Sequence, residues 1–169
     1  MSRFFPHTPY AEDQPLSRTI LTAHVLYRGF QAGAIGGIMN GVVRSLVTAI
    51  RTGSSSTMFA GWSALQRSTG IGSVIGLGGM VVMLPLKMWG KTEIEWKDRS
   101  WRLLENKGQM AVDDWSLSGA VLMPLYMFMR KQNGERLGWK MAMGRAGIGS
   151  TAGIIGYLSW TYLINGRAL

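Results

Sequence analysis

The chain alternates four long apolar blocks with shorter segments that carry nearly all of its charged residues. An α-helix needs about 20 mostly apolar residues to cross the roughly 30 Å hydrocarbon core of a bilayer. The blocks therefore predict an all-α membrane protein with about four transmembrane helices, over residues 26–50, 67–88, 114–131 and 144–166. Because the third block is the shortest, a re-entrant or oblique path is open for it as well as a full crossing.

The segments between the blocks differ in composition. Residues 1–15 are polar and rich in proline, which predicts an extended arm that is retained in the mature protein. Residues 16–169 predict a single polytopic membrane domain. Its polar linker, 89–113, predicts an interfacial or protruding helix with aromatic anchors, because Trp89, Trp96 and Trp101 stand among many charges. The segments 52–57 and 131–140 predict short turns.

Glycines recur at four-residue spacing in the first block, and positions four apart share one face of a helix. In lipid, such a strip of small residues lets a second helix approach backbone to backbone. Shorter strips occur in the second and fourth blocks, so we expect the first strip to pack within the chain. The predicted helix-packing residues are Gly29, Gly33, Gly37, Gly41, Gly72, Gly76, Gly149 and Gly153.

One short sequence occurs twice. Gly70-Ile71-Gly72-Ser73 recurs as Gly147-Ile148-Gly149-Ser150, each time at the start of an apolar block and just after an arginine. Two interpretations are open. The repeat indicates two hairpins of related design, or it is a coincidence in a chain that contains 23 glycines.

Charge and cysteine content narrow the function classes. The net charge is +9, but the lysines and arginines flank the apolar blocks, which is typical of membrane topology and phospholipid contact rather than nucleic-acid binding. We expect phospholipids, cardiolipin among them, as partners, and no nucleic acid. Because the chain has no cysteine, disulfides, thiolate zinc sites, iron–sulfur clusters and a cysteine nucleophile are excluded.

Candidate chemistry is sparse. Between the charged residues at their ends, the apolar blocks contain no Asp, Glu or Lys, and the charged side chain inside them is Arg44. Arg44 is interpreted as snorkelling to the interface or contacting a lipid or partner, with Trp89, Trp96 and Trp101 as further contacts. His24 is interpreted as a lone histidine near the interface. We therefore predict no enzyme activity, no cofactor and no metal site.

Part of the chain resembles a known family. Gly33-Ala34-Ile35-Gly36-Gly37, then Phe59-Ala60-Gly61-Trp62 and a glycine-rich second block, are similar to the Tim-type four-helix proteins of the mitochondrial inner membrane. The likeness covers roughly residues 29–85 and implies a preprotein translocase or channel component. The family's characteristic Arg and Asp between the first two spans are not both present, because no Asp occurs between Arg28 and Lys87.

The whole chain resembles fungal accessory subunits of mitochondrial respiratory complex I (NUXM type). The likeness lies in the length, the proline-rich start, the tryptophan-rich linker and the short basic tail. It implies a non-catalytic subunit of the membrane arm, multi-pass in the mitochondrial inner membrane, that supports assembly or stability. Its arm and polar linker would contact other membrane-arm subunits. The translocase remains the first alternative, and a lipid-binding membrane shaper is a further one.

Overall fold

The computed structural model describes residues 4–53, 57–129, 138–164 and 166. Within these residues every regular element is helical. The predicted turns over 52–57 and 131–140 lie largely outside the described residues. The elements are the short 3-10 helix η2 (Ala11–Asp13), α1 (Ser17–Thr52), α2 (Thr57–Met88), α3 (Glu93–Glu105), α4 (Lys107–Met129), α5 (Trp139–Ser159) and the π-helical turn η3 (Trp160–Ile164).

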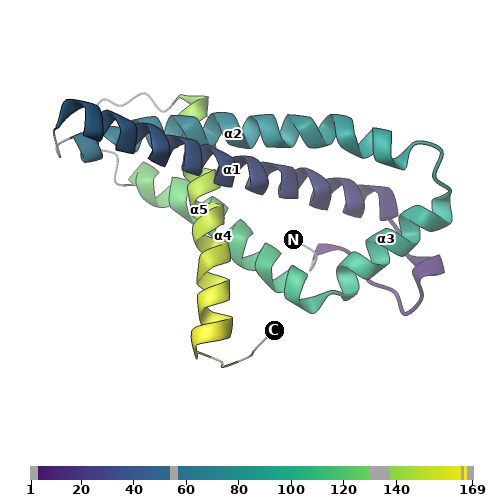
Figure 1. The fold of residues 1–169 in the computed structure, drawn as a ribbon. Helices are drawn as coiled ribbons and strands as arrows, with labels where there is room; N and C mark the ends of the chain where they lie inside the picture. Colours follow the sequence, from purple (N-terminus) through teal and green to yellow (C-terminus); the bar gives the residue numbers. More distant parts are fainter. Residues whose placement is uncertain (1–3, 54–56, 130–137, 165, 167–169) are drawn as a thin grey trace.

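Helices α1 and α2 form a long antiparallel pair that runs the length of the molecule (Figure 1). At 36 and 32 residues they measure about 54 Å and 48 Å. Helix α1 ends at Gly53, whose positive φ of 61° gives the left-handed conformation common after a helix. In the described part of the chain, α1 and the Gly61–Met88 portion of α2 are long and apolar enough to cross a membrane.

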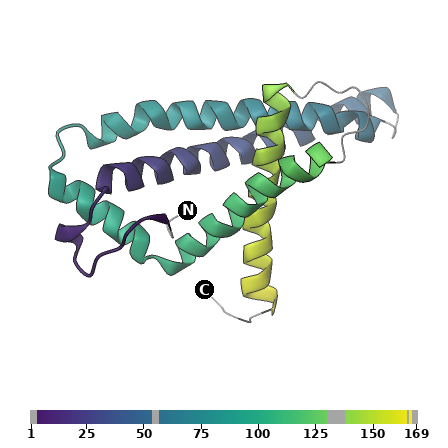
Figure 2. The same ribbon diagram turned by 180° about the vertical axis from the view of Figure 1, so that it is seen from behind.

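Helices α4 and α5 fall on the third and fourth predicted spans, but they do not extend the α1–α2 pair as parallel neighbours. Both views show α4 running obliquely and α5 crossing the pair steeply (Figures 1 and 2). Helix α5 contacts α2, α1 and α4 in turn. The helical class expected from the sequence is therefore present, with two helices of spanning length and composition among the described residues.

The amino-terminal arm lies against α3 within the same chain. The side chain of Gln14 is 1% exposed and donates to the carbonyl of Pro6 at 2.7 Å. Lys97 of α3 donates to the carbonyl of Glu12 at 2.9 Å. Helix α3 itself begins with a capping box, in which Thr92 and Glu95 each bond the other's backbone N–H. The hydrogen bond from Lys91, together with that capping bond, lowers the pKa of Glu95.

The interior is more polar than the surface of the long helices. The buried apolar residues are Ile20, Leu21, Phe30, Ala34, Leu84, Met88 and Leu104. The buried polar or charged residues are Gln14, Ser17, His24, Gln31, Gln66, Thr69, Ser73, Ser100, Asp113, Ser116, Arg145 and Ser150. By contrast, large apolar side chains on α1 and α2 point outward, among them Ile50, Ile75 and Val82, which are 81%, 68% and 60% exposed.

The glycines predicted to pack helices lie at two helix seams. Gly29, Gly33, Gly37 and Gly41 of α1 face α2, where Gly72 and Gly76 face them in return. A Cβ on Gly33 would collide with the carbonyl oxygen of Gly72, and a Cβ on Gly72 with that of Gly33. Gly149 and Gly153 of α5 face α4, against Gly119 and the backbone of Trp115. Only glycine permits backbones to approach this closely.

Replacing Gly37 by alanine is expected to destabilise the protein, whereas Gly36→Ala is the matched control on the neighbouring position. A Cβ on Gly37 would lie 2.6 Å from the carbonyl oxygen of Ser68, while nothing lies within 4 Å of a Cβ on Gly36. Overpacking costs about 1–3 kcal/mol, and alanine in place of glycine gains up to about 1 kcal/mol in a helix. Thermal unfolding in a mild detergent should lower the midpoint for G37A and not for G36A. Equal midpoints would contradict the close seam.

Candidate functional site

A cluster of charged side chains is buried between α1 and α4. Asp113 of α4 is 1% exposed, and its Oδ1 lies 2.7 Å from Nη2 of Arg28. Its Oδ2 lies 3.0 Å from Nδ1 of His24, which is itself 7% exposed. His24 and Arg28 are one turn apart on α1 and therefore project toward α4 together. The buried carboxylate is thus paired with two basic side chains of another helix.

The contacts of His24 define its hydrogen-bonding state. Arg28 donates its Nε proton to Nε2 of His24 at 3.5 Å, and the amide nitrogen of Gln109 lies 2.8 Å from the same atom. A guanidinium and an amide NH2 can only donate, so Nε2 accepts from both. On the other side of the ring, Nδ1 lies 3.0 Å from Oδ2 of Asp113. Each ring nitrogen of His24 therefore faces a polar group of the same chain.

Hydrogen bonds extend this cluster to a third helix. Gln31 accepts from Arg28 at 2.8 Å and donates to the hydroxyl of Ser116 at 2.8 Å. Tyr27 donates to Ser116 at 3.1 Å and lies 3.3 Å from the hydroxyl of Ser150 on α5. The cluster therefore connects α1, α4 and α5 where they meet. We call these residues the buried polar cluster: Tyr27, His24, Arg28, Gln31, Gln109, Asp113, Ser116 and Ser150.

One sequence-based interpretation is wrong at this site. His24 is not a lone histidine, because Asp113, Gln109 and Arg28 surround it. Helix α4 begins at Lys107, so Asp113, the last residue of the predicted polar linker, lies in a helix that continues through the third apolar block. The sequence feature that could have indicated this polar contact is the spacing of Asp113 and Ser116, which are three residues apart and hence lie on one helix face.

A second buried polar contact joins α5 to α2. Arg145 is 7% exposed, and its Nε donates to Oε1 of Gln66 at 3.1 Å. Gln66 is 1% exposed, and the neighbouring Thr69 and Ser73 are fully buried. Gly144 makes this approach possible, because a Cβ there would collide with the backbone of Gln66. The steep crossing of α5 over α2 is therefore fixed by a glycine contact and a charged hydrogen bond together.

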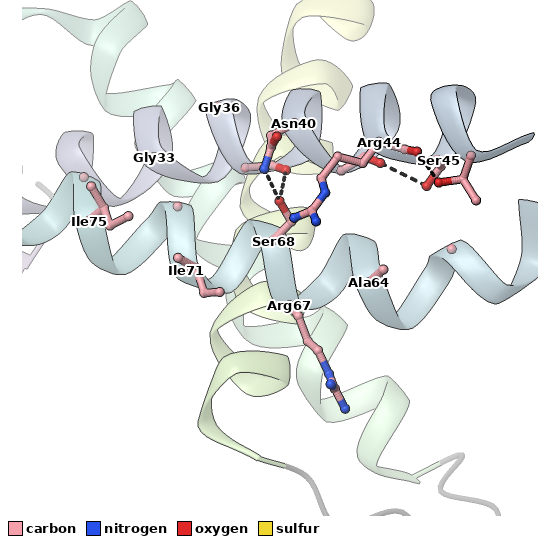
Figure 3. A pocket seen from close by; sticks show the side chains of 16 residues that line it. Gly33, Gly36, Asn40, Arg44, Ser45, Ala64, Arg67, Ser68, Ile71 and Ile75 are labelled. Carbon is pink, nitrogen blue, oxygen red and sulfur yellow. Dashed lines mark hydrogen bonds between the residues drawn. The ribbon is translucent and has the colours of Figure 1, made fainter. Parts of the chain in front are cut away.

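Arg44 lies over an open groove on the outer side of the α1–α2 seam (Figure 3). The groove has a volume of about 870 Å³. Ser68 of α2 donates to the carbonyl of Gly37 at 2.9 Å and accepts from Asn40 at 3.1 Å, which closes its floor. The lining residues are Gly33, Gly36, Gly37, Asn40, Gly41, Arg44, Ser45, Thr48, Gly61, Ala64, Arg67, Ser68, Ile71, Gly72, Ile75 and Gly76.

The three predicted tryptophan contacts lie in different environments. Trp89, just after α2, is 83% exposed and free to contact a lipid or a partner. Trp96 packs against the buried Leu21, Leu84 and Met88, with the guanidinium of Arg18 5.8 Å from its ring centroid. Trp101 donates to the carbonyl of Thr8 at 2.9 Å and stacks on His7. The last two therefore hold α3 and the arm in place.

Comparisons with known proteins add one finding. The model of a family described as "Protein of unknown function (DUF1757)" matches residues 11–148. No curated protein and no solved structure matches the chain. Among the described residues, no group of three or more His, Cys, Asp or Glu side chains is placed to hold a metal ion.

Replacing Asp113 by alanine is expected to destabilise the fold strongly. Breaking a buried ion pair by removing one partner costs about 3–5 kcal/mol, and we expect a loss at the lower end of this range because the Arg28 side chain is 31% exposed. Asp98→Ala is the matched control, since Asp98 forms an exposed pair with Arg102 one turn along α3, worth about 0–1 kcal/mol.

Chemical or thermal unfolding in detergent measures both losses, and the double variant R28M/D113L tests the cause. If the unpaired charge is responsible, removing both partners recovers a large part of the loss. A D113A protein as stable as D98A would show that the buried polar cluster does not hold α4 to α1.

Proposed function

Because the chain belongs to the DUF1757 family, whose description assigns no function, we propose a function from the geometry: a non-catalytic structural subunit embedded in a membrane. The resemblance found in the sequence makes the membrane arm of respiratory complex I, in the mitochondrial inner membrane, the proposed setting. In this role the protein supports assembly or stability of a larger complex and takes no part in electron transfer.

The observation that carries the proposal is the reversed distribution of polar and apolar side chains. Isolated apolar residues on a surface are ordinary, but contiguous apolar faces along two long helices mark a membrane or protein contact. Here α1 and α2 expose such faces, while serine, threonine, glutamine and charged groups fill the interior. A bilayer favours this arrangement, because lipid solvates the apolar outer face and polar groups must find hydrogen-bond partners inside the protein.

The contacts within the buried polar cluster support a structural role. His24, Arg28 and Asp113 are bonded to one another and to neighbouring amides and hydroxyls. They thereby fix α4 and α5 on α1. Surfaces available to partners include the outward apolar faces of α1 and α2 and the exposed Trp89. A subunit that supports a complex needs this combination of a rigid interior and an apolar exterior.

The proposal predicts that the chain resists extraction by alkaline carbonate and, after mild detergent, migrates on native gels with a respiratory complex. Deleting the chain should lower the amount of assembled complex while the remaining enzyme keeps its turnover per complex. A matched exterior variant, Val82→Arg, places a charge on the exposed apolar face of α2 and should reduce co-migration. A chain released by carbonate, or one migrating only as a free small protein, would overturn the proposal.

A translocase or channel component is the alternative that one observation favours: Arg44 and the α1 glycines line an open groove. A channel component requires that groove to hold water. Since the chain has no cysteine, a single Gly36→Cys substitution gives one reactive site. We expect this cysteine to resist a membrane-impermeant thiol reagent that is applied to both faces of the membrane. Labelling as fast as a cysteine at the exposed Trp89 would favour the channel instead.

A further inference from the structure

The groove at Arg44 has two chemically different ends. Gly33, Gly36, Ile71 and Ile75 line one part, and Ile75 is 68% exposed there. Toward the other end, Figure 3 shows the Arg44 side chain lying across the seam toward Ser68, while Arg67 projects away from it. The volume of about 870 Å³ falls within the roughly 300–1,000 Å³ typical of ligand sites. The groove thus offers an apolar trough that leads to a cationic group.

Gly36 keeps this trough open. Gly29, Gly33, Gly37 and Gly41 each contact α2, but nothing lies within 4 Å of a Cβ built on Gly36. Because Gly36 has no side chain, an occupant of the trough can lie close to the α1 backbone.

The charge of the groove indicates what that occupant carries. Arg44 and Arg67 line it and no acidic residue does. In the part of the chain that the structure describes, neither guanidinium forms an ion pair with a carboxylate. The hydroxyls of Ser45 and Thr48 are used by the carbonyls of Gly41 and Arg44. The guanidinium of Arg44 is therefore the donor left for a ligand, and guanidinium groups bind phosphate in a two-pronged geometry.

The position of Arg44 along α1 suits a lipid phosphate. Arg44 precedes the end of α1 at Thr52 by eight residues, or about 12 Å of helix. Helix α1 is about 54 Å long and exceeds the roughly 30 Å hydrocarbon core, so its end projects beyond the apolar region. The guanidinium can then reach the headgroup layer while the trough beside Gly36 and Ile75 stays at acyl-chain depth.

We propose that this groove binds one anionic diacyl phospholipid, with its phosphate at Arg44 and an acyl chain along Gly36, Ile71 and Ile75. The proposal rests on the membrane placement proposed above. A transmembrane helix in the same groove would have to bring an acidic group to Arg44, whereas an anionic lipid supplies both the negative charge and the flexible apolar chain. The bound lipid would seal the outer side of the α1–α2 seam.

The test uses the full chain, purified in an uncharged detergent, with mixed micelles of phosphatidylglycerol or phosphatidylcholine bearing the same acyl chains. Native mass spectrometry counts the lipid retained. We expect about tenfold tighter retention of phosphatidylglycerol, because the choline cation of phosphatidylcholine offsets the phosphate charge that attracts Arg44. Arg44→Gln should remove this preference. Arg51→Gln, an exposed arginine of α1 outside the groove, is the control and should keep it.

A second pair of variants tests the trough rather than the charge. Gly36→Phe should lower retention of both lipids, because the ring fills the floor of the groove. Gly78→Phe is its control: a Cβ there also meets nothing within 4 Å, but Gly78 does not line the groove. Both variants should unfold at the same temperature as the unsubstituted chain, so a loss of lipid in G36F alone reports on the groove.

Several results would overturn the proposal. They are equal retention of the two lipids, an equal effect of R44Q and R51Q, and displacement of phosphatidylglycerol by inorganic phosphate, which would indicate a phosphate site without a lipid. Cross-linking of a cysteine at Gly36 to another polypeptide in native membranes would assign the groove to a protein. A chain that stays in carbonate-washed membranes but fails these lipid tests refutes the groove alone, whereas release by carbonate refutes the membrane placement.

Discussion

The structure depends first on the direct backbone contact between α1 and α2. Gly33 and Gly72 stand opposite each other so closely that the carbonyl of each occupies the place of the other's side chain. Gly29 and Gly76 repeat this arrangement one turn further along. Each glycine costs about 1 kcal/mol of helix propensity relative to alanine. The close approach offsets that cost through dispersion contacts along the whole seam, which outside water are a main source of helix association.

A seam this tight determines what the remaining interior can contain. Large apolar side chains have no room where Gly33 and Gly72 meet, and the Leu21, Leu84 and Met88 cluster lies beyond that stretch. The contacts of α5 with α2 likewise involve small and polar residues, Gly144, Gln66 and Arg145 among them. Polar groups in such an interior are stable only when they are satisfied, because an unpaired buried donor or acceptor costs about 1–3 kcal/mol. The hydrogen bonds that link Arg28, Gln31 and Ser116 meet that condition, and the carboxylate of Asp113 forms ion pairs with Arg28 and His24. Polar contacts and close glycine contacts together therefore specify the positions of α4 and α5.

The α1–α2 contact could be predicted from the sequence, because four-residue spacing is a local property that a helix converts directly into a face. The contact between His24 and Asp113 could not be predicted from the sequence. These residues are 85 or more positions apart, and they meet only because of the relative rotation of two helices. The start of α4 could not be predicted either. Lys107 and Asp113 were assigned to the polar linker because charged residues were expected to lie outside the membrane spans. The contacts of Trp96 and Trp101 with α1, α2 and the arm could not be predicted either, because the exposure of an aromatic ring depends on tertiary packing.

The repeated tetrapeptide shows how one local pattern serves two seams at once. Gly72 packs on α1 and Gly149 packs on α4, so the second glycine of each copy contacts the preceding helix of its own hairpin. Gly70 and Gly147 both lie at the α2–α5 contact, where Gly147 meets Thr69 and Ser73. The two copies thus occupy equivalent places, and both terminal serines are fully buried. This equivalence favours the interpretation of two hairpins of related design, joined through their first glycines.

Arg28 and Arg44, two of the four arginines of α1, show how position alone divides structural from surface roles. Arg28 and Arg44 are 16 residues apart, or about 24 Å along the helix, close to the thickness of a bilayer's apolar core. Arg28 is held by Asp113, Gln31 and His24 of the interior. Arg44 faces an open groove that no acidic residue lines. In the proposed membrane placement, an anion from outside the chain can pair with Arg44, and the open floor at Gly36 leaves room for the molecule that carries it.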